Sequence, residues 1–558
     1  MMCPRNGTAP KFASALRRIV SWLPRPITAL TTRTEQTTAN QSTYELSRRL
    51  LLRALGIVLL IAIASLWLQV EGLMGPQGIA PVGDFLELAQ GALGAEAYWL
   101  LPTICWLESG AAMLHALCAV GTVMALMLIF DVAPGPALAC LWAIYLSLMV
   151  AGQTFLSFQW DSLLLESSFV ALFWAPWRFG ARNRCDGPPG LAGLCLLRIL
   201  LFKLMFLSGV TKLLCGDLPW HEWTALDVHF ETQPLPTWIG WYAHQLPSWF
   251  QKLSVAVMFM IEILVPFCIV CPRWLRHPGA ALMLCFQLLI ALSGNYGFFN
   301  LLTMTLCIPL FDDSFLARLA RRRNRRAESP HRAHAASWRR LAPVAVATFA
   351  IGAVSTLAFV EEMVRTLRSQ QRSVQAGAAL ASIPGPVVGA LDICDTALLS
   401  WGRPAILKWV GPWRTINGYG LFRNMTTQRP EIAVEGSRDG RRWHRYRFKW
   451  KPGDPGRRPG FVAPHQPRLD WQMWFAALHP AGHAHWLTPL AERLLRGHGP
   501  AVKLLASNPF PEQPPRHLRF VFYEYRFTDF ETRRRTGDWW QRRLVRRSQS
   551  FTLEDFQY

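Results

Sequence analysis

The chain has 558 residues, of which 51% are hydrophobic, yet its formal net charge is +22. Apolar runs of about 20 residues lack charges while arginines crowd between them, which excludes an ordinary soluble protein and indicates a multi-pass membrane protein. Nucleic-acid binding is not expected, because the arginines are divided among loops and no basic helix or aromatic-basic motif is present.

The first part of the chain predicts a tail followed by a bundle of membrane helices. Residues 1–43 are polar and basic, and we expect a disordered cytoplasmic tail. Residues 44–364 predict a transmembrane domain of about nine spans, near 51–70, 111–130, 136–154, 157–176, 194–214, 252–271, 278–293, 298–311 and 341–360. Arginines flank alternate turns, with a dense run from Arg318 to Arg326. The positive-inside rule therefore predicts a cytoplasmic N-terminus and a non-cytoplasmic C-terminal domain.

A large outer loop, residues 215–250, carries more chemistry than a simple connection between spans requires. Its run from Trp220 to Pro236, WHEWTALDVHFETQPLP, combines carboxylates, imidazoles, indoles and prolines. Linkers are usually short and polar, so we interpret this loop as a site or a partner-facing surface. Asp227, His229 and Glu231 alternate and would share one face of an extended chain. The H-E-x-x-H zinc motif fails at Ala225, and no metal is expected.

Several ionisable residues lie inside apolar runs, where each must face a partner or a cavity. Asp161 and Glu166 fall at the start of the run near 157–176, Lys203 is near the middle of the next span, and Glu262 follows in a later one. A pairing of Lys203 with Asp161 or Glu166 is the simplest way to offset burial of the charges. Such a pair either locks helices together or forms a proton or substrate site.

The last third of the chain is expected to be a soluble β domain. After an interfacial connector over 365–412, residues 413–545 predict an antiparallel sandwich, and 546–558 form a tail. Glu431–Gly436 and Trp443–Trp450 flank an Asp-Gly turn, which is typical of a β-hairpin. Leu518–Phe527 alternates in the same way and predicts another strand.

One run in this domain, RLDWQMWF, places charged residues beside aromatic ones. Arg468 and Asp470 are most simply a structural ion pair with each other. Trp471 and Trp474, if exposed, would be good anchors for a protein partner.

Several motifs in this order resemble the lipase maturation factor family, over about Tyr44 to Phe527. The matching stretches are GLMGPQGIAP, FQWDSLLLES, LLFKLMFLSGVTK, TALDVHFETQPLP, SGNYGFFN, INGYGLF, RLDWQMWFAAL and SNPFPEQPPR. The family's motif residues fall here on Gln159, Asp161, Glu166, Lys212, Trp220, Asp227, His229, Glu231, Gln233, Pro234, Asn417, Gly420, Arg468, Asp470 and Trp471. The membrane half is also similar to the transmembrane region of vitamin K-dependent γ-carboxylases, a likeness of fold that says little about chemistry.

The resemblance implies a membrane protein that helps secreted lipases, or other exported proteins, to fold and assemble on the non-cytoplasmic side. It implies the endoplasmic reticulum membrane in a eukaryote and the inner membrane in a bacterium. The expected partners are the lipid bilayer and a lipase-like client, and no cofactor is expected. The motif residues other than Asp161, Glu166, His229 and Glu231 are then expected to form a partner surface, and none is expected to be catalytic.

The alternative hypothesis is a membrane-embedded enzyme that modifies a lipid or an exported protein. Its candidate residues are Asp161, Glu166, Lys203, His229 and Glu231. The chain contains no P-loop, no G-x-S-x-G and no dinucleotide fingerprint after a strand, so the familiar enzyme classes are absent. A transporter is a third possibility, but no inverted hydropathy repeat favours it.

Overall fold

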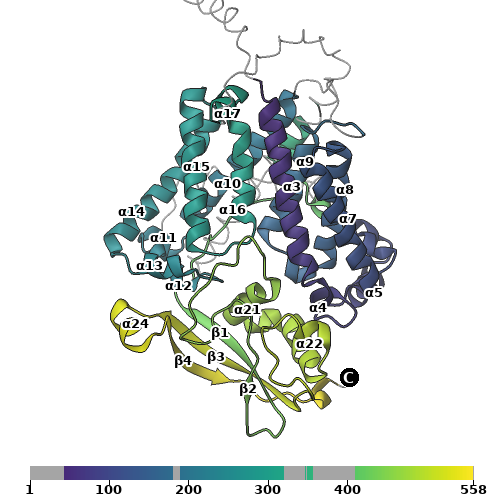
Figure 1. The fold of residues 1–558 in the computed structure, drawn as a ribbon, viewed down its shortest axis with the longest axis vertical. Coiled ribbons are helices and arrows are strands. Elements are labelled where there is room, and N and C mark those ends of the chain that lie inside the picture. Colours follow the sequence, from purple (N-terminus) through teal and green to yellow (C-terminus); the bar gives the residue numbers. More distant parts are fainter. Residues whose placement is uncertain (1–42, 180–188, 320–345, 347–348, 356–408, 557–558) are drawn as a thin grey trace, which may run out of the picture.

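The computed structural model describes residues 43–179, 189–319, 346, 349–355 and 409–556. A helical bundle carries the C-terminal domain against one of its ends, while the described N-terminal residues begin at the other end (Figure 1). The expected cytoplasmic tail over 1–43 and the connector over 365–412 lie almost wholly outside the described residues.

Six helices of the described residues are long and apolar enough to cross a membrane. They are α3 (Glu45–Trp67), α7 (Ala111–Ile129), α8 (Pro134–Ala151), α10 (Leu191–Leu214), the helix over Ser248–Val270 and α15 (Arg273–Ser293). The Ser248–Val270 helix consists of α14 (Ser248–Phe259), a π turn η4 (Met260–Leu264) and a 3-10 segment η5 (Val265–Val270). A seventh span arises if α16 (Phe299–Cys307) with η6 (Ile308–Leu310) is counted together with α17 (Asp313–Leu319), across a bend of 114°.

The described residues contain fewer spans than the nine expected for the chain, for two identifiable reasons. The expected span near 157–176 forms a helix of only 14 residues, α9 (Gln159–Leu172), preceded by the 3-10 turn η3 (Gln153–Leu156). The expected span near 341–360 lies mostly outside the described residues. Ten residues of α9 are buried, among them Asp161 and Glu166, so this helix lies inside the protein and not against lipid.

The outer loop over 215–250 is helical rather than extended. It contains α11 (Leu218–His221), α12 (Ala225–Thr232) and α13 (Trp238–His244). Thr237 begins α13 by accepting a hydrogen bond from Gly240 N at 3.0 Å, a typical N-cap. Asp227 and Glu231, four residues apart, therefore lie on one face of α12, and His229 lies on another.

Short elements also follow α3 at the end of the bundle nearest the C-terminal domain. They are α4 (Val70–Met74), α5 (Val82–Leu93), α6 (Glu96–Leu100) and η2 (Ile104–Trp106). Gly72 of α4 lies directly against the C-terminal domain, where a Cβ would meet Pro500 O at 2.4 Å and Leu504 Cγ at 2.8 Å. Only glycine allows α4 to approach the C-terminal domain this closely.

The C-terminal domain contains a four-stranded antiparallel sheet in the order β2-β1-β3-β4. The strands are β1 (Arg429–Ser437), β2 (His444–Arg445), β3 (His517–Phe527) and β4 (Trp540–Arg547). The hairpin and the strand over 518–527 are confirmed. Gly440 in the hairpin turn has φ +70°, a conformation that glycine adopts readily.

Helices, and not a second sheet, cover this sheet within the described residues. The helices that contact it are α21 (Arg468–Leu478) and α22 (Ala484–Leu495). The domain also contains α23 (Gly499–Val502), α24 (Phe530–Thr536) and the 3-10 turns η8 (Pro480–His483) and η9 (Leu553–Phe556), whereas η7 (Gly411–Trp413) packs on α8 through Trp413 and Trp142. Figure 1 shows α21 between the sheet and the bundle. The expected sandwich is therefore replaced by an α+β arrangement, in which the RLDWQMWF run is a helix.

The hydrophobic core is continuous between the bundle and the C-terminal domain. One cluster of buried side chains extends from α3 through α8 and α10 to β1, α21 and α22. Phe155, before α9, contacts Trp486 of α22 with ring centroids 5.6 Å apart. Apolar burial of this kind is the main favourable term in domain association. The two parts consequently pack as one body.

Candidate functional site

Buried charged residues join the bundle to the C-terminal domain, and we refer to Asp161, Glu166, Lys203, Tyr419 and Arg468 with their direct contacts as the domain junction. All five side chains are at most 3% exposed. A buried charge is tolerated only when it is paired and hydrogen-bonded, so the partners of each group determine what it can do.

Glu166 of α9 forms the first half of the junction. Its carboxylate pairs with the Lys203 ammonium of α10, which confirms the predicted pairing. The other carboxylate oxygen accepts hydrogen bonds from Asn417 N at 2.9 Å, Asn417 Nδ2 at 3.1 Å and Tyr419 OH at 2.6 Å. The INGYG segment of the C-terminal domain is thus held by a carboxylate inside the bundle.

Asp161 forms the second half, one helix turn earlier on α9. Arg468 of α21 binds it through both guanidinium arms, Nη1–Oδ2 at 2.6 Å and Nη2–Oδ1 at 2.8 Å. Tyr145 OH of α8 donates to Oδ1 at 2.5 Å, and Arg468 Nη1 also donates to Phe155 O at 3.2 Å. Two-armed pairing of this type fixes direction as well as charge, so it positions α21 on the bundle.

The expected ion pair between Arg468 and Asp470 is wrong, because the two side chains leave α21 in different directions. Asp470 accepts hydrogen bonds from the backbone N–H groups of Trp450 and Lys451, each at 2.8 Å. Burial raises the pKa of the Asp470 carboxyl, an effect that these hydrogen bonds oppose. Asp470 therefore fixes the segment that follows β2 and has no contact with the bundle charges.

Trp471 is not an exposed anchor. Its side chain is only 3% exposed and packs edge-on against Trp160 at 4.7 Å and Phe158 at 5.8 Å. Trp474 is half-buried, and its Nε1 donates to Thr232 O of α12 at 2.8 Å. Both indoles belong to the contact between α21 and the bundle, which a tryptophan-rich sequence alone could not distinguish from a partner surface.

A further buried pair lies beside the junction within the bundle. Lys212 of α10 contacts both oxygens of Glu262, at 2.7 and 2.5 Å. The Lys212 ammonium also lies over the Trp220 ring at 5.4 Å, and Trp220 Nε1 donates to Phe422 O at 3.0 Å. Gln159 Oε1 accepts from Gly420 N at 3.3 Å. The last two contacts tie residues 420–422 to the outer loop and to α9.

His229 of α12 is part of a separate hydrogen-bonded cluster. Its Nε2 is 3.1 Å from Tyr296 OH, and that hydroxyl donates to Gln233 Oε1 at 2.7 Å. Burial, and to a lesser degree the positive charge of Lys212, lowers the pKa of His229 to about 4. A neutral ring that donates from Nε2 fits this arrangement.

The other acids and Pro234 of the outer loop also make structural contacts. Glu231 Oε2 accepts from Phe527 N at 2.9 Å and is 3.7 Å from His244 Nε2. Asp227 Oδ2 accepts from Ser248 Oγ at 3.3 Å. Pro234 O accepts from Arg429 Nη2 of β1 at 2.9 Å. The outer loop and the C-terminal domain therefore lie at the same end of the bundle and contact each other directly.

Sequence analysis missed several polar residues that complete these contacts. Asn295 receives hydrogen bonds from Val462 N at 2.8 Å and Ala463 N at 3.0 Å, and donates to Leu235 O at 3.1 Å and Gly460 O at 2.8 Å. Gln69 of the loop after α3 accepts from Arg468 N at 2.8 Å. The available signals in the sequence were Asn295, an amide in the SGNYGFFN motif, and Gln69, an amide at the end of the first apolar run.

Little free reactivity remains in this arrangement. The Asp161 and Glu166 carboxylates have their hydrogen-bonding positions taken by cations, hydroxyls and amides, so neither is placed to act as a general base on a substrate. Among the described residues, no group of three or more His, Cys, Asp or Glu could hold a metal ion. The enzymatic alternative is not supported, and the class defined by the structure is a polytopic membrane protein with a C-terminal domain fixed to its bundle.

Comparisons with known proteins identify the family. Residues 46–318 match the lipase maturation factor transmembrane domain, and residues 415–550 match the lipase maturation factor C-terminal domain. The chain is 37% identical to lipase maturation factor 2 of Homo sapiens, over 90% of this chain and 82% of that protein. It is 33% identical to lipase maturation factor 1 of Bos taurus, over 90% of this chain and 88% of that protein.

The chain belongs to the lipase maturation factor family, as its motifs indicated. Rattus norvegicus lipase maturation factor 2 is 36% identical over 89% of the chain. No solved structure matches this chain significantly.

Proposed function

We propose that this protein assists the folding or assembly of an exported lipase, or of a similar exported protein, at the end of the bundle that carries the C-terminal domain. The names of its relatives support a maturation role, and the domain junction supports this placement. A client surface attached through buried ion pairs stays at a fixed height and orientation above the membrane. A mobile tether would lose that orientation.

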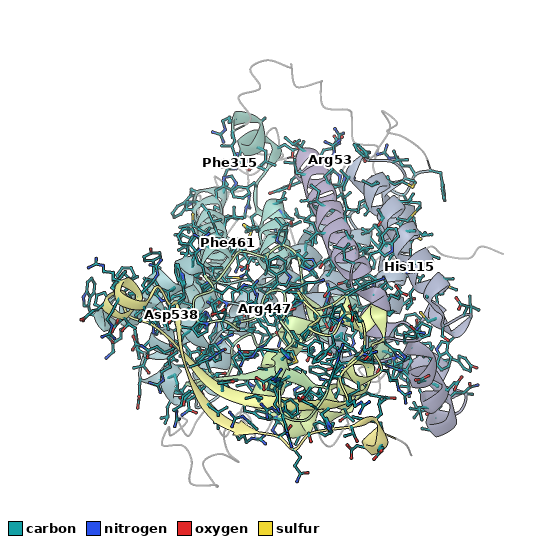
Figure 2. All side chains as sticks on the ribbon, turned by 60° about the horizontal axis from the view of Figure 1, so that its bottom comes forward. Arg53, His115, Phe315, Arg447, Phe461 and Asp538 are labelled. Atoms are coloured by element: carbon teal, nitrogen blue, oxygen red, sulfur yellow. The ribbon has the colours of Figure 1, made fainter. Side chains whose placement is uncertain are left out.

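We further propose that this end of the bundle is non-cytoplasmic. Arg53 of α3 lies at the end of the bundle opposite to the C-terminal domain (Figure 2). Arg276, at the start of α15, donates to Leu310 O at 2.9 Å, beside α17 at the same end (Figure 1). Excess arginine favours the cytoplasmic side of a membrane protein. The host membrane would be the inner membrane in a bacterium and the endoplasmic reticulum membrane in a eukaryote.

A secretion assay tests the maturation role. Cells that lack this chain and express an exported lipase should release lipase protein of low specific activity, and the full chain should restore the activity. A chain ending before Asn417 should insert in the membrane without restoring it. The exposed-site variant Arg535→Ala, on α24, provides the matched control. Equal lipase activity with and without the chain would refute the proposal.

Crosslinking in native membranes tests the partner. A photoreactive group at exposed Arg447 should attach to the exported lipase. One at exposed Phe179, near the turn between α7 and α8 at the opposite end of the bundle, should not. Attachment of the lipase only to the second position would place the client at the wrong end of the protein.

A further inference from the structure

The C-terminal sheet has a pocket of about 780 Å³ that does not belong to the domain junction. Its lining includes Glu431, Ala433 and Glu435 of β1 and Tyr523 and Tyr525 of β3. Alternate residues of a strand face opposite sides, and the intervening Ile432 and Val434 belong to the core that contains α21. The pocket therefore opens on the sheet face opposite Val434 and extends to the edge of β1, where Ile432, Tyr446 and Phe448 also line it. Figure 2 turns the C-terminal domain toward the viewer.

The pocket has a short side chain in its floor and a fixed wall at one end. Ala433 is flanked by two longer carboxylate side chains, which leaves a hollow between them. The segment 451–457 crosses the sheet, where Gly453 O accepts from Tyr525 OH at 2.5 Å and from Arg542 Nη1 at 3.0 Å. The same segment reaches β4, because Pro455 O accepts from Trp540 N at 3.2 Å. The hollow is consequently preformed.

Charge in the lining is unevenly distributed. The cationic members are Arg445, Arg447, Lys451, Arg457 and Arg542, and the acidic members are Glu431, Glu435 and Asp454. Two of the carboxylates are already neutralised. Glu431 contacts Arg429 at 2.8 Å and Lys451 at 2.7 Å, and Glu435 contacts Arg519 of β3 at 2.9 Å. The pocket therefore attracts an anionic group.

Hydrogen-bond donors for such a group remain available. Arg445 uses only Nη2, for Tyr523 OH at 2.8 Å and Glu435 Oε1 at 3.5 Å, and Arg542 uses only Nη1, for Gly453 O and Tyr525 OH. Each guanidinium carries five N–H donors. Tyr523 accepts from Arg445 and retains its own hydroxyl proton. Arg447 is exposed, and its guanidinium has no hydrogen bond or ion pair to any residue that the structure describes.

We propose that this pocket binds a carboxylate carried by an extended peptide segment of the exported client, an inference that rests on the proposed function. The guanidinium groups of Arg445, Arg447 and Arg542 would receive the carboxylate, for which two-armed pairing is well suited. Trp443 and Tyr523 supply apolar surface for the neighbouring peptide.

Labelled peptides test the chemistry with the full chain in lipid nanodiscs. Three fluorescein-labelled peptides are compared by anisotropy: alternating Thr and Glu with an amidated C-terminus, alternating Thr and Gln amidated, and alternating Thr and Gln with a free C-terminal carboxylate. The acidic peptide should bind at least about tenfold more tightly than the amidated Gln peptide. Tight binding of the third peptide would assign the site to a chain terminus, and its weakness would assign the site to an acidic side chain.

Matched variants locate the binding site. Arg447→Glu should weaken the acidic peptide about tenfold, and Ala433→Leu should weaken it by filling the hollow without a change of charge. Arg535→Glu, an equal change of charge on α24 outside the pocket, should leave the affinity unchanged. Equal affinities for the acidic and amidated Gln peptides, or equal losses in Arg447→Glu and Arg535→Glu, would overturn the proposal.

The secretion assay separates this inference from the proposed function. If Arg447→Glu loses peptide binding but lipase activity is independent of the chain, the pocket exists and the maturation role fails. If the chain supports lipase activity and Arg447→Glu binds the acidic peptide normally, the pocket inference alone fails.

Discussion

The domain junction and the pocket use the same kinds of residue under opposite conditions. In the junction Arg468 is fully buried and its guanidinium holds Asp161 with both arms. At the pocket Arg447 is exposed, and its guanidinium has no hydrogen-bond or ion-pair partner among the described residues. An arginine in the sequence thus indicates that an anionic group is bound. Whether that group is a carboxylate of the protein or a ligand depends on how buried the arginine is and on whether its guanidinium already has a partner.

The difference has an energetic consequence. Removing two charges from water costs several kcal/mol per ion, so a buried pair contributes less to stability than its geometry suggests, while breaking it strands a charge in the interior. An exposed charge loses little when its partner is removed, because water replaces it. Substitutions at the two places should therefore differ strongly in their effects on stability.

Breaking the junction is expected to give the largest effect. Arg468→Met leaves the Asp161 carboxylate buried without its cation and should lower the unfolding free energy by about 3–5 kcal/mol. The measurement is thermal or denaturant unfolding of the purified chain in detergent.

The double variant Asp161→Leu/Arg468→Met serves as its control, because it removes both charges. It should be distinctly more stable than Arg468→Met alone. Equal stability of the single variant and the original chain would show that the pair does not join the two parts.

Truncation of Trp471 is expected to give the next largest effect. Trp471→Ala opens a cavity between α21 and the aromatic residues before and on α9, and should cost about 3 kcal/mol in unfolding free energy. Trp223→Ala removes an indole that is 45% exposed and should cost far less. A similar loss for both variants would contradict the position of Trp471 in the junction.

Acidification should destabilise the hydrogen-bonded cluster of His229, Tyr296 and Gln233 by an intermediate amount. The pKa of His229 is lowered from 6.5 to about 4 in the folded protein, chiefly by burial, so its neutral form is favoured there. The contribution of neutral His229 to the unfolding free energy is complete above pH 6.5 and is lost as pH falls toward 4. We expect this loss to be about 1–3 kcal/mol, because the ring remains partly accessible.

His229→Gln provides the comparison for this pH dependence. Unfolding measured at successive pH values should show a flatter profile between pH 6.5 and 4 for His229→Gln, since the titrating group is gone. His244, whose pKa is also lowered chiefly by burial, should leave a residual slope of the same sign. The exposed His221→Gln should keep the original profile, and a flattening in that variant instead would assign the slope elsewhere.

An exposed ion pair should give the smallest effect. Arg543 of β4 contacts Glu524 of β3 at 2.6 Å, but its side chain is 79% exposed. Arg543→Ala should change the unfolding free energy by less than about 1 kcal/mol, and the change should shrink further at high salt. A loss as large as that of Arg468→Met would remove the distinction between buried and exposed pairs.

Sequence reasoning succeeded where one local pattern has one structural meaning. Apolar runs predicted the membrane helices, and the Asp-Gly turn between alternating segments predicted the hairpin of β1 and β2. Lys203 in an apolar run predicted a buried acidic partner, because an isolated charge in that place is too costly. The expected span near 157–176 is a buried helix of 14 residues, α9, and hydropathy did not distinguish the two because a buried helix and a short membrane span have the same hydrophobic composition.

Pairing over long sequence distances was beyond the same reasoning. Arg468 and Asp470 are neighbours in the chain, and their charges match, yet Arg468 binds Asp161 from another domain. Trp471 had the composition of a partner anchor and proved to be core. In each case the choice depended on which surface lies opposite the helix α21, and no local pattern carries that information.

The sequence by itself determined the membrane class, the family and the identity of the motif residues, because hydropathy and short motifs are properties of adjacent residues. Only the tertiary structure decided that these residues join the bundle to the C-terminal domain. Hydrogen bonds and ion pairs act over a few ångströms in space, and the folded chain alone brings Asp161 and Glu166 to Arg468, Asn417 and Tyr419.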